Sequence, residues 1–350
     1  MVIKLRNEVK ESLIWNVFNK AARNRIPLQV TLELTYRCNL ACQHCYVPLA
    51  GTDELSFSEV CAILDQLHEV GTVFTAFTGG EIFIRKDFLE ILQYARSKNF
   101  IVAIQTNGTL IDSSVADELR NQRVSLIEMS LYGATSKTHD CVTQVVGSFK
   151  KTINSIGLLI DAGVPLRLKS PQMSLNVHEC AETKSLADRL AVPLAASPRL
   201  APAKDGNKKS QELSISHDQF RIFAAQFPAW VNQECSLDNE GPERLLCKAG
   251  TAVCSITPEG KVNPCVMMPL EVGDLRARKF QNIWFSVENQ HLNKLRSIHP
   301  KEIFCTSCNR MHYCVRCPGV AYMENGDFYG RSPSACQIAE WCIDEMTNKT

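Results

Sequence analysis

The sequence predicts an α/β protein built from a partial (β/α)6 TIM-like barrel and a small cysteine-rich domain that follows it. The barrel is indicated by short apolar runs that alternate with segments of helical periodicity along the first part of the chain. The second domain is indicated by cysteines that crowd into the last third, where the periodicity fades. Such a pattern is typical of a domain stabilised by metal clusters and not by a large apolar core.

The apolar runs predict parallel strands, and the segments between them predict crossover helices. The strands are expected at residues 29–34, 73–78, 101–106, 126–131, 165–169 and 192–196. The helices are expected at residues 58–70, 86–98, 113–122, 148–162 and 178–190. In such barrels the functional residues lie in the loops that follow the carboxyl ends of the strands. The site is therefore expected in those loops.

Composition shifts divide the chain further. The predicted division is 1–27 for a helical arm, 28–205 for the barrel, 206–246 for a linker with one helix at 217–227, and 247–350 for the cysteine-rich domain. The arm is expected to be an amphipathic helix over residues 7–25, because its apolar residues recur at helical spacing. This apolar stripe consists of Leu13, Ile14, Val17, Phe18 and Ala21.

Charge and hydropathy exclude several classes of partner. The 38 Lys and Arg residues nearly balance the 37 Asp and Glu residues, and no basic stripe stands out, so a nucleic-acid partner is not expected. No stretch approaches the roughly 18–20 apolar residues of a membrane span, and the N-terminus lacks the apolar core of a signal peptide. The sequence predicts a cytoplasmic protein without a membrane partner.

Sixteen cysteines are too many for chance core positions, and a cytoplasmic location disfavours disulfides, so metal ligation is expected. Cys38, Cys42 and Cys45 form a first group with the spacing C-x3-C-x2-C, directly after the first predicted strand. Three thiolates can bind three irons of a 4Fe-4S cluster and leave the fourth iron open as a binding site. A structural zinc ion, with His44 as a fourth ligand, is the alternative.

This cysteine group, together with Thr78-Gly79-Gly80-Glu81 after the second strand, resembles the radical S-adenosylmethionine (SAM) superfamily. The resemblance covers roughly residues 28–198. It implies that SAM binds the open iron and that a one-electron reduction cleaves SAM to a 5'-deoxyadenosyl radical. It also implies that Gly79, Gly80 and Glu81 hold the methionyl amine of SAM, because glycines admit close approach and a carboxylate accepts from an ammonium group.

The same resemblance extends to later strands. Gln105, Asn107 and Ser130 match family positions near the SAM ribose and methionyl group, although isolated residues of these types are often caps or turn formers. Arg167 and Lys169 are candidates for the SAM carboxylate. We expect only one of these two to face the barrel interior.

The cysteines of the last third resemble the SPASM extension of radical SAM enzymes. Two residues separate Cys314 from Cys317, whereas that pattern usually has three residues there. Eight thiolates suffice to close two further 4Fe-4S clusters, which would give three clusters in all. Two zinc knuckles are the alternative. The resemblance implies that the ligands are Cys247, Cys254, Cys265 and Cys317 for auxiliary cluster I, and Cys305, Cys308, Cys314 and Cys336 for auxiliary cluster II.

The SPASM resemblance implies an enzyme that abstracts hydrogen from a ribosomally made peptide to form a cross-link, invert a stereocentre or excise a fragment. Sulfatase maturation to formylglycine is disfavoured, because that family places Asp where this chain has Val266. A small-molecule reaction, such as haem side-chain decarboxylation, is a further alternative. An iron–sulfur electron carrier or redox sensor is the non-enzyme alternative, but an iron left open beside an amine-binding turn serves no purpose in a carrier.

Three partners follow from this interpretation. They are a precursor peptide, an electron donor such as flavodoxin or ferredoxin, and a protein that recognises the leader of the peptide. The last is expected to be separate, because about 28 residues before the first strand are too few for a compact recognition domain. The apolar stripe of the arm is the predicted docking surface for it.

Overall fold

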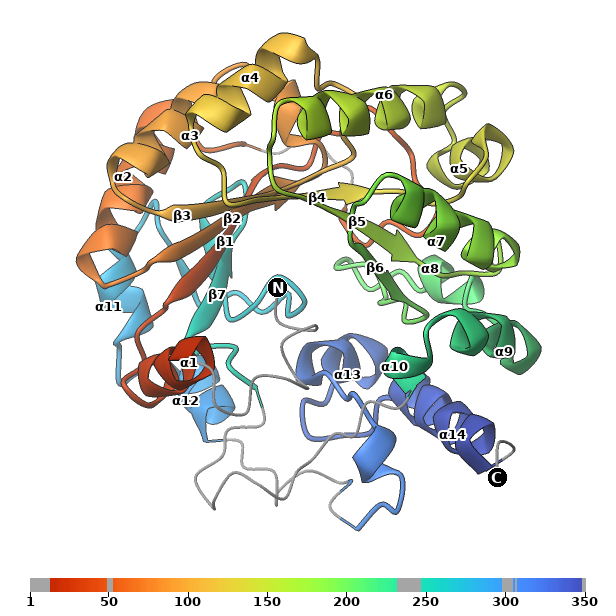
Figure 1. Cartoon of the computed structure of the whole chain (residues 1–350). Helices are drawn as coiled ribbons and strands as arrows, with labels where there is room; N and C mark the ends of the chain where they lie inside the picture. Colours follow the sequence, from red (N-terminus) through yellow and green to blue (C-terminus); the bar gives the residue numbers. More distant parts are fainter. Residues whose placement is uncertain (1–12, 49–52, 232–246, 298–304, 306, 348–350) are drawn as a thin grey trace.

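The computed structural model describes residues 13–48, 53–231, 247–297, 305 and 307–347. Within them one nine-stranded sheet runs in the order β6-β5-β4-β3-β2-β1-β7-β8-β9. The sheet curves into an open barrel with helices on its outside (Figure 1). This confirms the predicted fold class. The first six strands are β1 Gln29–Thr35, β2 Phe74–Gly79, β3 Ile101–Thr106, β4 Leu126–Ser130, β5 Leu166–Pro171 and β6 Leu194–Ser197.

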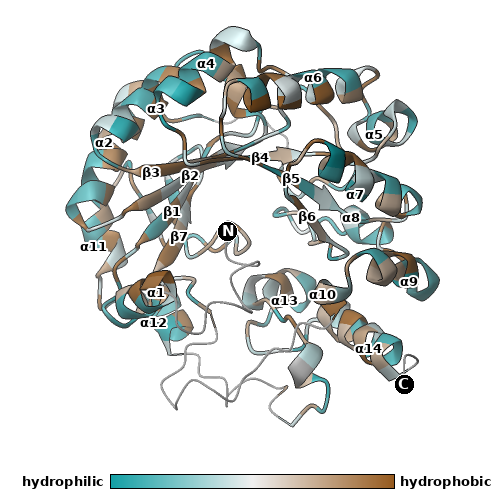
Figure 2. Cartoon of the chain, in the orientation of Figure 1, coloured by the Kyte–Doolittle hydropathy of each residue, from teal (hydrophilic) through white to brown (hydrophobic). Residues whose placement is uncertain are grey.

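The outer helices cover the apolar face of this sheet. They are α2 Phe57–Glu69, α3 Phe88–Ser97, α4 Ser113–Asn121, α6 Ser148–Asp161 and α7 Cys180–Arg189, each within a few residues of its expected range. Alternate residues of a strand point to opposite faces. In β1, Val30, Leu32 and Leu34 therefore pack in the outer core, whereas Glu33 points into the barrel. Figure 2 shows the exposed sides of these helices as largely hydrophilic.

One barrel helix was not predicted. Helix α5, Ser136–Thr143, follows β4 and precedes α6. Its sequence is largely polar, so periodicity gives no signal, and its beginning is marked only by the Thr135 side chain that accepts from Thr138 N. The short η1 Ile82–Ile84 and η2 Val177–Glu179 follow β2 and β5.

The cysteine-rich part contributes strands to the barrel sheet, which the sequence analysis missed. Strand β7, Val253–Ile256, pairs parallel with β1, and β8 Lys261–Asn263 and β9 Gly273–Asp274 continue antiparallel. These strands are too short to show a period. The domain boundaries stay predictions, and parts of the predicted arm, linker and last domain (1–12, 232–246, 298–304, 306 and 348–350) lie outside the described residues.

Helices α10 Pro228–Val231, α13 Pro318–Asn325 and α14 Pro333–Thr347 lie across the open side of the barrel, between β7 and β6 (Figure 1). Helix α11, Phe280–Trp284, packs instead against α2 on the outside, and α9, His217–Gln226, packs against α7. The other helices of this part of the chain are α8 Lys209–Glu212, α12 Gln290–Arg296 and η4 Met311–Tyr313. No helix of the described chain is long and apolar enough to cross a membrane.

The described part of the arm is helix α1, Leu13–Arg23. Phe18 stacks on Phe74 at a ring-centroid distance of 5.7 Å, and Ala21 is buried against the barrel. Leu13 is 80% exposed and Val17 is 38% exposed. The apolar stripe therefore covers the barrel at its C-terminal end and faces solvent at its N-terminal end.

Candidate active site and metal centres

The first cysteine group lies on the loop that follows β1, and helix α5 holds this loop in place. Ala41 N donates to Thr143 O at 3.0 Å, and Gln43 N donates to Val142 O at 3.1 Å. These two carbonyls belong to the last turn of α5, where they lack helical partners. The end of α5 therefore fixes the backbone on both sides of Cys42.

Helix α5 is itself held at both ends by carboxylates. Glu179 Oε2 accepts from Ala134 N at 2.8 Å, and its Oε1 accepts from Thr138 Oγ1 at 2.6 Å. Asp140 accepts from Gly147 N at 2.7 Å and from Phe149 N at 2.8 Å, which ties α5 to the start of α6. Backbone hydrogen bonds lower the pKa of Asp140 despite partial burial, so the carboxylate stays ionised. Sequence periodicity could not reveal this support.

The backbone of Gly79 and Gly80 contacts the backbone at the beginning of the cysteine loop. Gly79 has φ +141°, and a Cβ there would collide with Thr35 O. A Cβ on Gly80 would collide with Arg37 O. Gly80 N donates to Thr35 O at 2.7 Å. Glycine is needed at both positions because two backbones meet there.

Glu81 is fully buried and accepts hydrogen bonds from the neighbouring strand end. Its carboxylate accepts from Thr106 Oγ1 at 2.7 Å, from Asn107 N at 2.7 Å and from Phe83 N at 3.2 Å. Burial raises its pKa, and these donors oppose the shift. Glu81 therefore ties the loop after β2 to the loop after β3. The binding of an amine by Glu81 stays a prediction.

Asn107 connects the loop after β3 to the first cysteine. Its Nδ2 donates to Asn39 Oδ1 at 2.9 Å and lies 3.9 Å from Cys38 Sγ. Its Oδ1 accepts from Thr109 N at 2.9 Å, which fixes the orientation of the amide. The structure thus brings Asn107, Glu81 and the cysteine loop together.

A row of polar side chains crosses the inner face of the barrel, one from each of several neighbouring strands. Thr78 Oγ1 contacts Gln105 Oε1 at 3.2 Å, and Gln105 Nε2 donates to Glu128 Oε2 at 2.9 Å. Glu128 forms ion pairs with Arg167 and, at 3.6 Å, with Lys169 Nζ. The expectation that only one of these two cations faces inward was wrong, because residues two apart on a strand share a face.

His44 and Ser130 lie near Tyr132, which follows β4. The His44 ring stands edge-on to Tyr132 with centroids 4.8 Å apart. Burial lowers the pKa of His44 to about 4, so this imidazole is neutral. Ser130 is half-buried at the end of β4.

The opposite side of the barrel interior holds a buried ion pair. Lys204, from the segment after β6, reaches Glu33 of β1, and their side chains are 7% and 0% exposed. Lys204 Nζ lies 5.8 Å from the ring centroid of Tyr36 and 5.6 Å from that of Tyr46. Lys204 N also donates to Tyr46 O at 2.9 Å. This pair links the last barrel strand to the first and secures the residue after Cys45.

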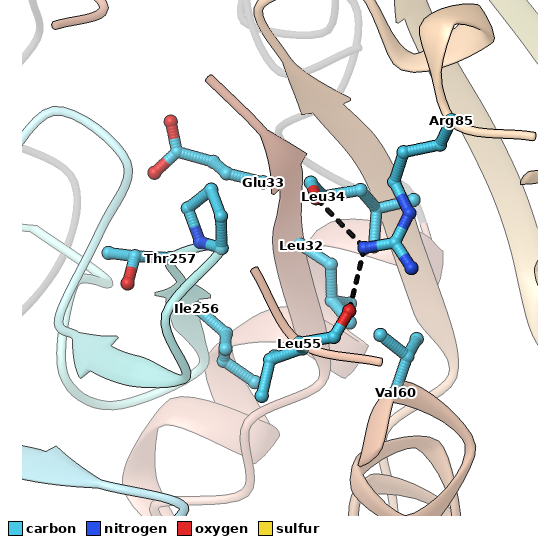
Figure 3. Close-up of a pocket in the computed structure, with 9 residues that line it drawn as sticks. Leu32, Glu33, Leu34, Leu55, Val60, Arg85, Ile256 and Thr257 are labelled. Atoms are coloured by element: carbon cyan, nitrogen blue, oxygen red, sulfur yellow. Dashed lines mark hydrogen bonds between the residues drawn. The ribbon is translucent and has the colours of Figure 1, made fainter. Parts of the chain in front are cut away.

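Arg85 supports the end of β1 from the outer side. Its Nη1 donates to Leu34 O and to Leu55 O, each at 3.0 Å, in a pocket between β1 and the segment after β7 (Figure 3). Its Nη2 forms an ion pair with Asp87 at 2.7 Å. Arg85 thus fixes the backbone from which the cysteine loop departs.

The proposed ligands of auxiliary cluster I share one neighbourhood. Burial raises the pKa of Cys254 and of the half-buried Cys265, and a neighbouring thiolate raises each further: Cys265 for Cys254, and Cys247 for Cys265. Loss of solvation and the Cys317 thiolate raise the pKa of Cys247, although this residue is partly exposed. Gly250 N donates to Pro264 O at 3.1 Å, which ties the loop of the first two cysteines to the third.

The second set shows a similar arrangement. Cys308 N donates to Cys305 O at 3.0 Å in a tight turn. Burial raises the pKa of Cys305, and the thiolates of Cys336 and Cys308 raise it further, whereas Arg316 opposes them. Cys314 follows η4, and Cys336 lies in α14. The interleaved assignment is therefore compatible with the structure and stays a prediction.

In the described parts of the chain, no three His, Cys, Asp or Glu side chains converge on a point that one metal ion could occupy. The ligands of a 4Fe-4S cluster each bind a different iron and surround a larger object than one ion. The three groups are rich in thiols, most of them half-buried, which suits soft iron–sulfur chemistry.

A parallel barrel with a three-cysteine loop and a glycine turn at the carboxyl ends of adjacent strands defines a class of cofactor-dependent α/β enzymes. Residues 32–171 match the Radical SAM superfamily, and residues 247–318 match the SPASM iron-sulfur cluster-binding domain. The chain belongs to the radical SAM superfamily and carries a SPASM domain. These domains imply 4Fe-4S clusters and SAM binding.

Named relatives fall into two groups. Mycofactocin maturase MftC of Mycolicibacterium smegmatis is 30% identical over 82% of this chain and 77% of the relative. AdoMet-dependent heme synthase of Methanosarcina barkeri is 27% identical over 89% of this chain and 97% of the relative. The structure of Streptococcus suis SuiB bound to precursor peptide SuiA has a TM-score of 0.71, 16% identity, and covers 92% of this chain and 79% of SuiB. The last likeness shows the fold alone.

Proposed function

We propose that this radical SAM/SPASM enzyme modifies a ribosomally made peptide. The main support for this proposal is the 30% sequence identity with a mycofactocin maturase over most of both chains. A protein named for subtilosin biosynthesis, AlbA of Bacillus subtilis, is 27% identical over 80% of this chain. The SuiB structure shows that this fold can hold a precursor peptide.

We propose that Cys38, Cys42 and Cys45 hold the SAM-binding cluster, and that the glycine turn and Asn107 line the SAM site. SAM bound there supplies the 5'-deoxyadenosyl radical that abstracts hydrogen from the substrate. The protein contributes orientation. The end of α5 fixes the cysteine loop, the Gly79–Gly80 backbone lies under it, and Glu81 links the two strand ends.

We propose that Gln105, Ser130, Arg167 and Lys169 contact SAM from the inner face of the barrel. Glu128 accepts from Gln105 and forms ion pairs with Arg167 and Lys169. It therefore neutralises part of the charge of these two cations. Burial works to raise the pKa of Glu128, but the cations outweigh it and lower the pKa, so the carboxylate is ionised. Lys169, whose side chain is 41% exposed, keeps donors free for a carboxylate.

The proposed assignment gives three 4Fe-4S clusters, with the two auxiliary sets in the SPASM domain. The proposed partners are the precursor peptide, a flavodoxin or ferredoxin as electron donor, and a separate leader-recognition protein. The exposed Leu13 and Val17 of α1 are available for that protein, whereas Phe18 is engaged with the barrel.

The test is to co-express the chain with a precursor peptide from its gene neighbourhood, with and without a candidate recognition protein, and to measure the peptide mass. A mass change that requires the recognition protein supports both the substrate and the partner. Full modification by the chain alone removes the need for the partner. No modification in either case removes the peptide proposal.

A second candidate is a tetrapyrrole reaction, which the near full-length likeness to an AdoMet-dependent heme synthase favours. Anaerobic incubation with SAM, dithionite and an iron porphyrin bearing propionates separates the two. Loss of carbon dioxide from the porphyrin, with no change in the peptide, would select this candidate.

A further inference from the structure

Two arginines are packed into the loops that carry the auxiliary-cluster cysteines, and the proposed function assigns them no role. Arg296, in α12, is 9% exposed. Its Nε donates to Gly250 O at 2.7 Å, and its Nη2 donates to Trp284 O at 2.8 Å. Gly250 lies between Cys247 and Cys254. The guanidinium is therefore anchored on the loop with two of the four proposed ligands of auxiliary cluster I.

Arg316 lies between Cys314, a proposed ligand of auxiliary cluster II, and Cys317, a proposed ligand of auxiliary cluster I. Its Nε donates to Gly330 O at 2.9 Å, and its Nη2 donates to the same oxygen at 2.6 Å and to Phe328 O. Each arginine is thus fixed by backbone carbonyls and forms no ion pair with a carboxylate among the described residues.

In both side chains the remaining nitrogen, Nη1, is buried and has no hydrogen-bond partner in the described part of the protein. A guanidinium is planar, so anchoring Nε and Nη2 also fixes the direction of Nη1. A buried guanidinium nitrogen without an acceptor is unfavourable, although the Trp284 ring, 5.0 Å from Arg296 Cζ, offsets part of the charge of Arg296. We therefore expect an anionic hydrogen-bond acceptor next to Nη1 of Arg296 and of Arg316.

The proposed ligand cysteines near both arginines become anionic as thiolates, and the Asp327 carboxylate is a further anion near Arg316. Burial lowers the pKa of Arg296 to about 10, and the Cys254 thiolate opposes this shift. A 4Fe-4S cluster held by four thiolates is a net anion with sulfur acceptors, so it matches both the charge and the hydrogen-bonding need.

We propose that Arg296 and Arg316 are the counter-charges of auxiliary clusters I and II, each donating from Nη1 to cluster sulfur and raising the reduction potential of its own cluster. Reduction adds an electron to an anionic cluster, and a fixed neighbouring cation stabilises the reduced form. This inference rests on the proposed cysteine ligands.

The test is an EPR-monitored redox titration of the reconstituted full-length protein, with the SAM-binding cluster recognised by its response to added SAM. Arg296→Gln should make the midpoint potential of one auxiliary cluster more negative, and Arg316→Gln should do the same for the other. The matched controls are Lys294→Gln, on the solvent side of α12, and Arg310→Gln, which removes a surface partner of Glu340. Both controls remove the same charge and should leave all three potentials unchanged.

Equal shifts in the variants and their controls, or no shift in Arg296→Gln and Arg316→Gln at full iron content, would overturn the proposal. If Arg296→Gln loses iron, the iron content of Arg296→Lys is measured next. Iron retained in Arg296→Lys supports the counter-charge, whereas an equal loss of iron shows a purely structural role of Arg296. A wild-type protein with only about four irons, the content of one cluster, would instead reject the proposed ligands.

Discussion

Replacement of Lys204 by Met tests whether the buried ion pair with Glu33 secures the barrel. The Met side chain fills a similar volume but leaves a carboxyl that is 0% exposed without its cation. Removal of one partner from a buried pair costs about 3–5 kcal/mol. Tyr36 Oη, at 3.4 Å from Glu33 Oε2, is too weak a donor to replace the ammonium group.

The pH dependence of this loss has a defined sign. Burial raises the pKa of Glu33, and Lys204 opposes that shift, so the pKa rises further in Lys204→Met. A carboxyl with a raised folded-state pKa adds stability below its unfolded-state pKa and loses it as the pH rises through the folded-state value. The variant should therefore be most destabilised at pH 8 and less so near pH 5, where Glu33 takes up a proton.

The assay is anaerobic urea unfolding followed by far-UV circular dichroism at both pH values. Glu33→Gln/Lys204→Met should recover most of the lost stability, because both charges are gone. Lys261→Met, which removes a cation from a surface network with Glu271 and Asp274, is the control and should change the midpoint far less. An unchanged urea midpoint for Lys204→Met at pH 8, or no recovery in the double variant, would refute the reasoning.

The other predictions concern cofactor content and SAM binding. Wild-type protein should hold about twelve irons after anaerobic reconstitution, and Cys38→Ala/Cys42→Ala/Cys45→Ala should retain about eight; zinc in place of the missing iron would reject the auxiliary clusters. Gly80→Ala should lose the SAM-binding cluster and keep the auxiliary irons, because its Cβ collides with Arg37 O; full iron content would contradict this. Glu81→Ala should weaken SAM binding at unchanged iron content and cost about 1–3 kcal/mol of stability, because Asn107 N loses its acceptor; unchanged SAM affinity would remove the amine-binding role.

The barrel could be predicted from sequence because each strand and helix carries its own local period. The residues of β1 alternate between the outer core and the interior, and helices α2, α3, α4, α6 and α7 bury one face each. The spacing of Cys38, Cys42 and Cys45 could also be recognised, since these three cysteines lie close together in one loop.

Tertiary contacts could not be predicted in this way. Strand β7 joins the sheet through backbone pairing with β1, which leaves no trace in so short a run. Helix α5 is polar and depends on Asp140 and Glu179. Lys204 reaches Glu33 across 171 positions of sequence. The error on Arg167 and Lys169 was of another kind, because the two-residue period already places them on one face.

The central claim is that a radical formed from SAM removes hydrogen from a peptide, and deuterium transfer tests it most directly. The reduced enzyme is incubated anaerobically with SAM and a precursor peptide that is deuterated throughout its core segment, and the 5'-deoxyadenosine is analysed by mass spectrometry. The account predicts deuterium in 5'-deoxyadenosine in step with the mass change of the peptide. Unlabelled 5'-deoxyadenosine beside an unmodified peptide would contradict it.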